Sequence, residues 1–163
     1  MRRYSLQLVC FVVFSFLGMV AQEKPAAPQP LPGAEYSGMY SFLRDGEFVQ
    51  ITVEDQGHVT GFVSRYGDSE SDRGAFLDHF FKEGKLDGNK LGFTTVAVHA
   101  IWFEFRGAVE RGEGKKAGDE AYYVLKGILT EYTTDETKKT TSRSRDVAFK
   151  SFPQDAMPPA KKD

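Results

Sequence analysis

Cysteine and proline are both scarce where this 163-residue chain looks folded. Cys10 is the one cysteine, and it lies in an apolar N-terminal stretch. All seven prolines lie in the two flanks, so residues 33–152 contain none. Without a second cysteine the chain cannot form an internal disulfide or a multi-thiolate metal site. Any folded domain in this chain must therefore be stabilised by its apolar core.

The chain also has no excess of positive charge, and it lacks the local sequence motifs of common enzymes. Lys and Arg number 21 against 23 Asp and Glu, a net charge of −2, which argues against a nucleic-acid partner. The sequence contains no nucleophile elbow, phosphate-binding loop or dinucleotide fingerprint. We therefore expect a protein that is not an enzyme, that needs no cofactor and that does not bind nucleic acid.

Metal-binding patterns are incomplete. His58, His79 and His99 are about twenty residues apart, unlike the close pairs that usually ligate a metal. Carboxylates alternate over residues 68–72, as at the start of a calcium loop, but Arg73 stands where that loop needs glycine. The sequence thus predicts a solvated acidic loop here and no metal site.

Residues 1–21 have the layout of a secretory signal. Arg2 and Arg3 precede an apolar run over residues 8–20, which is shorter than the roughly twenty residues of a membrane span. A cut after Ala21 would leave 19 basic residues (21 less these two) against 23 acidic ones, a net charge of −4. We expect a secreted or periplasmic protein without a membrane span after signal cleavage; the alternative is an uncleaved N-terminal anchor.

Both flanks of the remaining chain are proline-rich. Residues 22–35 contain four prolines and are predicted to form an extended linker. Residues 153–163 contain three prolines and end in Lys-Lys-Asp, which is typical of a flexible tail. One domain is left between them, over residues 36–152.

Glycine decides the fold class of that domain. Fourteen of the sixteen glycines fall within residues 38–127, too densely for long helices. Asp45-Gly46, Asp55-Gln56-Gly57 and Asp87-Gly88-Asn89 separate runs in which apolar and polar residues alternate, the pattern of β-hairpins. We expect eight strands, over residues 36–43, 47–55, 58–66, 76–87, 90–99, 101–112, 121–131 and 140–152.

Short connections favour antiparallel neighbours, and closure into a ring protects the sheet edges. The prediction is therefore an all-β, single-domain, antiparallel up-and-down β-barrel of about eight strands. A signal peptide and a Pro-rich linker precede it. The polar stretches 67–75 and 111–120 would form loops over its mouths. A transmembrane outer-membrane barrel is the alternative, but its unbroken lipid-facing apolar face and terminal aromatic residue are missing.

Three short motifs resemble the avidin and streptavidin family, within the wider lipocalin-like group of ligand-binding barrels. They are SGMY at 37–40, VTGF at 59–62 and LGFT at 91–94. The resemblance runs in order over residues 36–152 and implies the same barrel topology. It does not extend to the biotin site: Phe42, Val63 and Phe103 stand where the family has polar contacts to biotin, and Trp102 is the sole tryptophan.

These substitutions predict an apolar lumen. An eight-stranded barrel is just wide enough to be filled by its own side chains or to hold one small ligand. The first expectation is an exported non-enzymatic module that binds a small apolar ligand in its lumen. The alternative is an envelope or extracellular interaction or structural protein with a filled core, acting through its loops. The candidate ligand-binding residues are Tyr40, Phe42, Val63, Phe93, Phe103 and Phe105, with Ile101 beside them.

Overall fold

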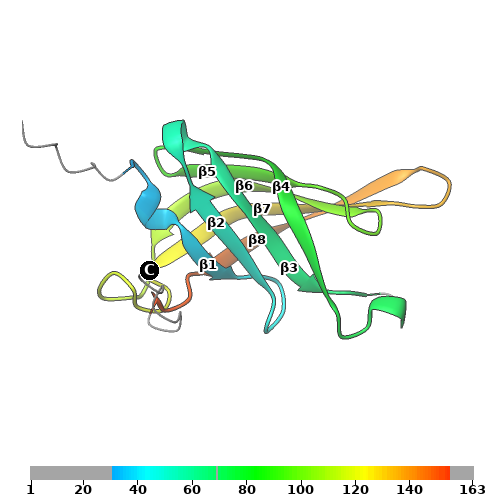
Figure 1. The fold of residues 1–163 in the computed structure, drawn as a ribbon, viewed down its shortest axis with the longest axis horizontal. Coiled ribbons are helices and arrows are strands. Elements are labelled where there is room, and N and C mark those ends of the chain that lie inside the picture. The colour runs from blue at the N-terminus through cyan, green and yellow to red at the C-terminus, as the bar shows by residue number, and fades with distance from the viewer. Residues whose placement is uncertain (1–30, 69, 155–163) are drawn as a thin grey trace, which may run out of the picture.

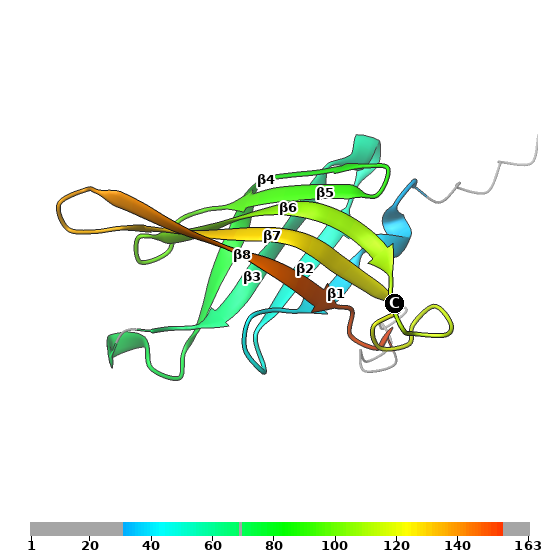
Figure 2. The same cartoon turned by 180° about the vertical axis from the view of Figure 1, so that it is seen from behind.

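The computed structural model describes residues 31–68 and 70–154, and within them the chain forms one antiparallel sheet of eight strands in sequence order. Figures 1 and 2 show the sheet curling round on itself, which confirms the predicted all-β up-and-down architecture. The strands are β1 (Gly38–Ser41), β2 (Phe48–Val53), β3 (Val59–Tyr66), β4 (Phe76–Asp87), β5 (Lys90–Thr95), β6 (Ile101–Arg111), β7 (Tyr123–Thr134) and β8 (Thr140–Lys150).

Short 3-10 turns supplement the strands. η1 (Ala34–Tyr36) precedes β1, η2 (Asp55–Gly57) joins β2 to β3, and η3 (Glu70–Asp72) lies in the β3–β4 loop. The η2 turn depends on Gly57, which has φ +70°, and a Cβ there would lie 2.2 Å from the carbonyl oxygen of Leu86. Only glycine fits this backbone conformation and this close approach without strain.

The alternating pattern of the sequence sets the inner and outer faces. In β2, Val49, Ile51 and Val53 are buried while Thr52 between them is exposed. Because successive side chains of a strand point to opposite faces, one face of each strand builds the core. That core consists of Tyr40, Phe42, Val49, Ile51, Val53, Val59, Val63, Leu86, Leu91, Phe93, Phe103, Phe105, Val109, Leu125, Leu129 and Phe149.

The ring closes where β1 meets the end of β8, at a junction that we call the seam. Tyr40 and Ser151 form an isolated antiparallel bridge, and Phe152 N donates to the carbonyl oxygen of Met39 at 2.9 Å. Lys150 N also donates to Ser41 Oγ at 3.0 Å. β1 has 4 residues and β7 has 12, so the β7–β8 hairpin extends well beyond the seam (Figure 2). The barrel is therefore closed at one end only.

The two ends of the barrel carry different segments. η1, the β6–β7 connection (residues 112–122) and the chain after β8 lie at the seam end. The β1–β2 turn, the β3–β4 loop and the β7–β8 turn lie at the other end (Figure 1). The predicted signal (residues 1–21) and most of the predicted linker and tail lie outside the described residues. No helix in the described part of the chain is long and apolar enough to cross a membrane.

Candidate functional site

All six candidate ligand-binding residues point into the barrel. Phe42 is 7% exposed and the other five are at most 3% exposed. Ile101 is half-buried and packs against the same core. The structure thus brings together the residues that the sequence pattern selected: Tyr40, Phe42, Val63, Phe93, Phe103 and Phe105.

These side chains pack mainly on one another. The Phe42 ring contacts Phe103 edge-on at 5.4 Å between ring centroids and lies 5.1 Å from Phe149. Phe93 stacks on Phe105 at 5.4 Å and on Phe81 at 4.2 Å. Aromatic rings at these distances are in van der Waals contact, so they fill much of the interior. Ligand contact at these positions stays a prediction.

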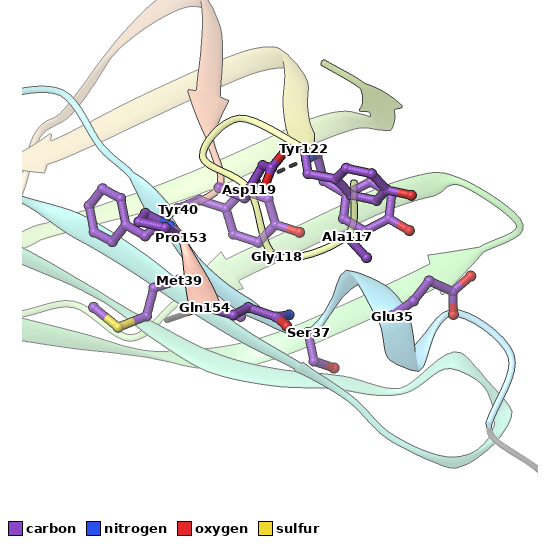
Figure 3. A pocket seen from close by; sticks show the side chains of 14 residues that line it. Glu35, Ser37, Met39, Tyr40, Ala117, Gly118, Asp119, Tyr122, Pro153 and Gln154 are labelled. Carbon is purple, nitrogen blue, oxygen red and sulfur yellow. Dashed lines mark hydrogen bonds between the residues drawn. The ribbon is translucent and has the colours of Figure 1, made fainter. Parts of the chain in front are cut away.

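A cavity of about 460 Å³ lies at the seam. We call it the seam cavity, and its volume is within the range of small-molecule sites. Its walls come from η1 and β1, from the β6–β7 connection and from the chain after β8 (Figure 3). Its apolar and aromatic lining comprises Met39, Tyr40, Tyr122, Tyr123, Phe152 and Pro153, and its main polar side chains are Glu35, Ser37, Asp119 and Gln154.

Tyrosines build the inner wall of the seam cavity. Tyr40 OH donates to the carbonyl oxygen of Tyr36 at 2.7 Å, and Tyr36 meets Tyr123 edge-on at 5.0 Å. Tyr122 meets Tyr123 edge-on at 4.7 Å. Burial raises the pKa of Tyr40, and Tyr123 and Tyr36 raise it further, so its phenol stays neutral. Tyr40 belongs both to the barrel core and to this wall, and it links the two.

The outer wall is a loop held in place by hydrogen bonds between side chains and the backbone. Asp119 Oδ2 accepts from the amides of Lys115 and Lys116, both at 3.0 Å. The Arg111 guanidinium lies 3.3 Å from the centre of the Tyr122 ring and donates to the carbonyl oxygens of Tyr122 and Gly114, both at 3.1 Å. These contacts fix the β6–β7 connection over the opening.

Ionisable residues gather inside the opposite end of the barrel. Arg65 and His79 are buried on the inner face, and Arg65 also bonds Asp68 and the carbonyl oxygen of Tyr66. Buried Glu47 accepts from Arg44 Nε at 2.9 Å and from Tyr66 N at 3.0 Å. Each buried charge thus has partners, as burial requires. These contacts hold the β1–β2 turn against the β3–β4 loop.

The three histidines lie apart from one another. His58 Nδ1 is 2.9 Å from Glu54, and His99 Nδ1 is 2.7 Å from Asp72. His79 lies inside, whereas its neighbour Asp78 accepts from Ser64 Oγ at 2.7 Å on the outer face. Among the described residues, no group of three or more His, Cys, Asp or Glu side chains could hold a metal ion.

Sequence reasoning found the lumen residues and missed the seam cavity. Its walls join residues 35–40 to residues 117–123 and 151–154, segments that are far apart in the chain. The adjacent Tyr122 and Tyr123 behind a glycine-rich loop were the available signal. In a strand, two adjacent tyrosines point to opposite faces of the sheet. Their presence alone therefore does not predict a cavity.

Comparison with known proteins gives structural likeness alone. No protein-family model matches the sequence, and no curated protein matches it. Apo short afifavidin is similar in structure with a TM-score of 0.52, 16% identity and coverage of 74% of this chain and 97% of that chain. The intact apo form of afifavidin gives a TM-score of 0.56, 15% identity and coverage of 81% and 95%. Together with the strand order, these likenesses show that the chain has an avidin-like fold.

Proposed function

We propose that this protein is an exported, non-enzymatic β-barrel module that binds a small apolar molecule in the seam cavity. The observation that carries the proposal is a space of about 460 Å³ lined by tyrosines, Met39, Phe152 and Pro153. A concave, mostly apolar site with a few polar groups is the usual form of a small-molecule site. Tyr40 is then the ligand contact among the candidate lumen residues. Phe42, Val63, Phe93, Phe103 and Phe105 support it from within the barrel.

The polar groups of the seam cavity favour binding over catalysis. Ser37 Oγ accepts from Val53 N at 2.9 Å, and Ser151 Oγ accepts from Tyr123 N at 3.2 Å. No histidine stands among the described lining residues to act as a base for either hydroxyl. Both serines therefore support the wall.

Export is supported by the sequence of residues 1–21, with its two arginines and its apolar run. N-terminal sequencing of the protein from the extracellular or periplasmic fraction of its own host tests this part. A mature chain that begins near Gln22 is expected. An intact Met1 in the cytosolic fraction would contradict it.

Native mass spectrometry of the protein from its own host tests ligand binding. A co-purifying small molecule is expected. Ala117, an exposed lining residue, offers a blocking variant: Ala117→Trp should fill the space and lose the molecule. Ala97→Trp, at another exposed alanine in the β5–β6 loop, is the matched control and should keep it. Binding that survives Ala117→Trp would overturn the assignment of the site.

An interaction protein is the second candidate function, and exposed aromatic side chains favour it. Phe80 is 57% exposed and Phe76 is 49% exposed on the outer face of β4. Phe80 lies 5.6 Å from Phe62, and Phe76 stacks on Tyr66 at 4.5 Å. Exposed apolar clusters of this kind often mark protein interfaces. For this function, a double Phe76→Ser, Phe80→Ser variant would lose a partner that Ala117→Trp retains.

A further inference from the structure

The seam cavity has a mostly apolar and aromatic lining that includes two acidic residues. Met39 and Pro153 lie at one side of Figure 3, and Glu35 lies at the other. Glu35 and Asp119 are the charged residues of the described lining, which includes no lysine or arginine. We propose that the molecule bound here is an organic cation, with a compact apolar body and one positively charged nitrogen. This inference rests on the proposed function: it keeps the small apolar body of the ligand and adds one positive charge to it.

Glu35 supplies a carboxylate without a counter-ion. Its side chain is exposed on η1 and makes no hydrogen bond or ion pair with a described residue. Its charge reaches the tyrosine wall: burial, Tyr122 and then Glu35 raise the pKa of Tyr123, and Arg111 opposes them. A cation at the cavity opening would therefore meet a free negative charge.

Asp119 supplies the second carboxylate. It is half-buried, and its partners among the described residues are the backbone amides of Lys115 and Lys116, both bonded to Oδ2. Amides hydrogen-bond a carboxylate but leave its negative charge in place. Oδ1 has no hydrogen-bond partner within the described part of the chain, so it is free to accept from a ligand.

Arg111 is a basic side chain beside the tyrosine wall, but it does not line the seam cavity. Its guanidinium lies over the Tyr122 ring and is held by two carbonyl oxygens, outside the lining of the seam cavity. This contact shows that an aromatic ring of this wall accommodates a cation, as expected from its electron-rich face. Tyr40 and Tyr123 offer further rings to a charged nitrogen inside the cavity.

An anion of the same shape would be disfavoured. It would come close to the carboxylates of Glu35 and Asp119, and like charges at short range repel. A protonated amine would instead be attracted to these carboxylates. The apolar part of the same molecule would pack against Met39, Tyr40 and Phe152. Charge and shape together thus select the ligand class.

Three molecules with one apolar body test the inference: adamantylamine, adamantanol and adamantane carboxylate. Their dissociation constants for the purified protein are measured by calorimetry at low and at moderate salt. The amine is expected to bind about ten-fold tighter than the carboxylate, with the alcohol between them. Added salt should reduce this preference, because it screens exposed charges.

Two charge-removing variants locate the effect. Glu35→Gln should weaken amine binding about three- to ten-fold and leave alcohol binding unchanged. Glu136→Gln, at the β7–β8 turn far from the cavity, is the matched control and should change neither. Equal or tighter carboxylate binding would overturn the charge inference while the proposed function stands. So would amine binding that is insensitive to Glu35→Gln. Failure of all three molecules, together with no co-purifying species, would overturn both.

Discussion

Arg65 donates from Nε to His79 Nε2 across 3.2 Å, and both side chains are buried inside the barrel. Because Nε2 accepts this bond, the imidazole proton lies on Nδ1. The backbone of Val96 and Ile101 lies near the ring, but no hydrogen bond of normal geometry reaches Nδ1 within the described structure. The ring also packs edge-on against Phe103 at 5.2 Å. The neutral His79 ring is thus buried between the Arg65 guanidinium and the aromatic core.

His79 makes the fold sensitive to mild acid. Burial and the charge of Arg65 lower its pKa from 6.5 to about 4, against smaller opposing effects of the Val96 and Ile101 carbonyls and of Asp78. Below pH 6.5 the unfolded chain therefore takes up a proton that the folded chain does not. The free energy of unfolding should fall as the pH drops from about 6.5 to about 4, by up to roughly 3 kcal/mol. Urea unfolding across this window measures it.

His79→Gln is the control variant, because glutamine has no proton to gain. Its unfolding free energy should change little between pH 6.5 and 4, whatever its absolute stability. Hydrogen bonds lower the pKa of Glu54, and ion pairs with arginines lower that of Asp68 against the opposing effect of burial. The stability that these two carboxylates contribute is lost below about pH 4.5, in both proteins. An unchanged slope in His79→Gln would show that another group controls this window.

Phe103 tests which face of the sheet is the core. It is 1% exposed and contacts Phe42, His79 and the Arg65 guanidinium. Phe103→Ala should lower the free energy of unfolding by about 3–5 kcal/mol, and Phe103→Asp should prevent folding. Phe80→Ala, the same change at a side chain that is 57% exposed, should cost less than about 1 kcal/mol. Similar losses for the two alanine variants would contradict the assigned inner face.

Gly57 and Gly88 separate backbone strain from steric clash. Both have positive φ, +70° and +60°, but a Cβ at Gly88 meets nothing within 4 Å. Gly88→Ala should therefore cost about 1 kcal/mol of unfolding free energy from conformation alone. Gly57→Ala should cost clearly more, because its Cβ would lie 2.2 Å from the carbonyl oxygen of Leu86. Thermal unfolding of the two variants compares them, and equal costs would show that the turn relaxes freely.

Biotin is expected not to bind. Phe42, Val63 and Phe103 occupy the lumen positions where the resemblance implies polar contacts, and all three are buried side chains that cannot form hydrogen bonds. A polar head placed there would lose its hydrogen bonds to water without replacement. Calorimetric titration with biotin should give no binding heat, and a saturating isotherm would refute this reading of the lumen.

The strands were predictable because alternation and turn residues are local signals. The segments predicted at 76–87 and 101–112 match β4 and β6 almost to the residue. The predicted strand 90–99 overshoots β5, which ends at Thr95. The chain then forms a loop in which His99 and Ala100 have positive φ. Non-glycine residues rarely adopt this conformation, so the sequence carried no sign of the loop.

Non-local features were beyond the sequence pattern. Arg65 shares the inner face with Val63, yet a period-two pattern cannot say that Asp68 and His79 provide its partners. The seam cavity depends on how the two ends of the sheet meet. That meeting follows from the accumulated twist and curl of all eight strands, so no single segment encodes it.

The seam is the weakest junction of the barrel, because it is short. Backbone amide hydrogens should exchange fastest at the seam, because it consists of one bridge and a few hydrogen bonds. Strands β6, β7 and β8, by contrast, pair along their lengths. A molecule bound in the seam cavity would touch β1 on one side and the chain after β8 on the other. A bound ligand would therefore stabilise the seam. The slowing of amide hydrogen exchange on ligand addition should be greatest at Tyr40 and Phe152.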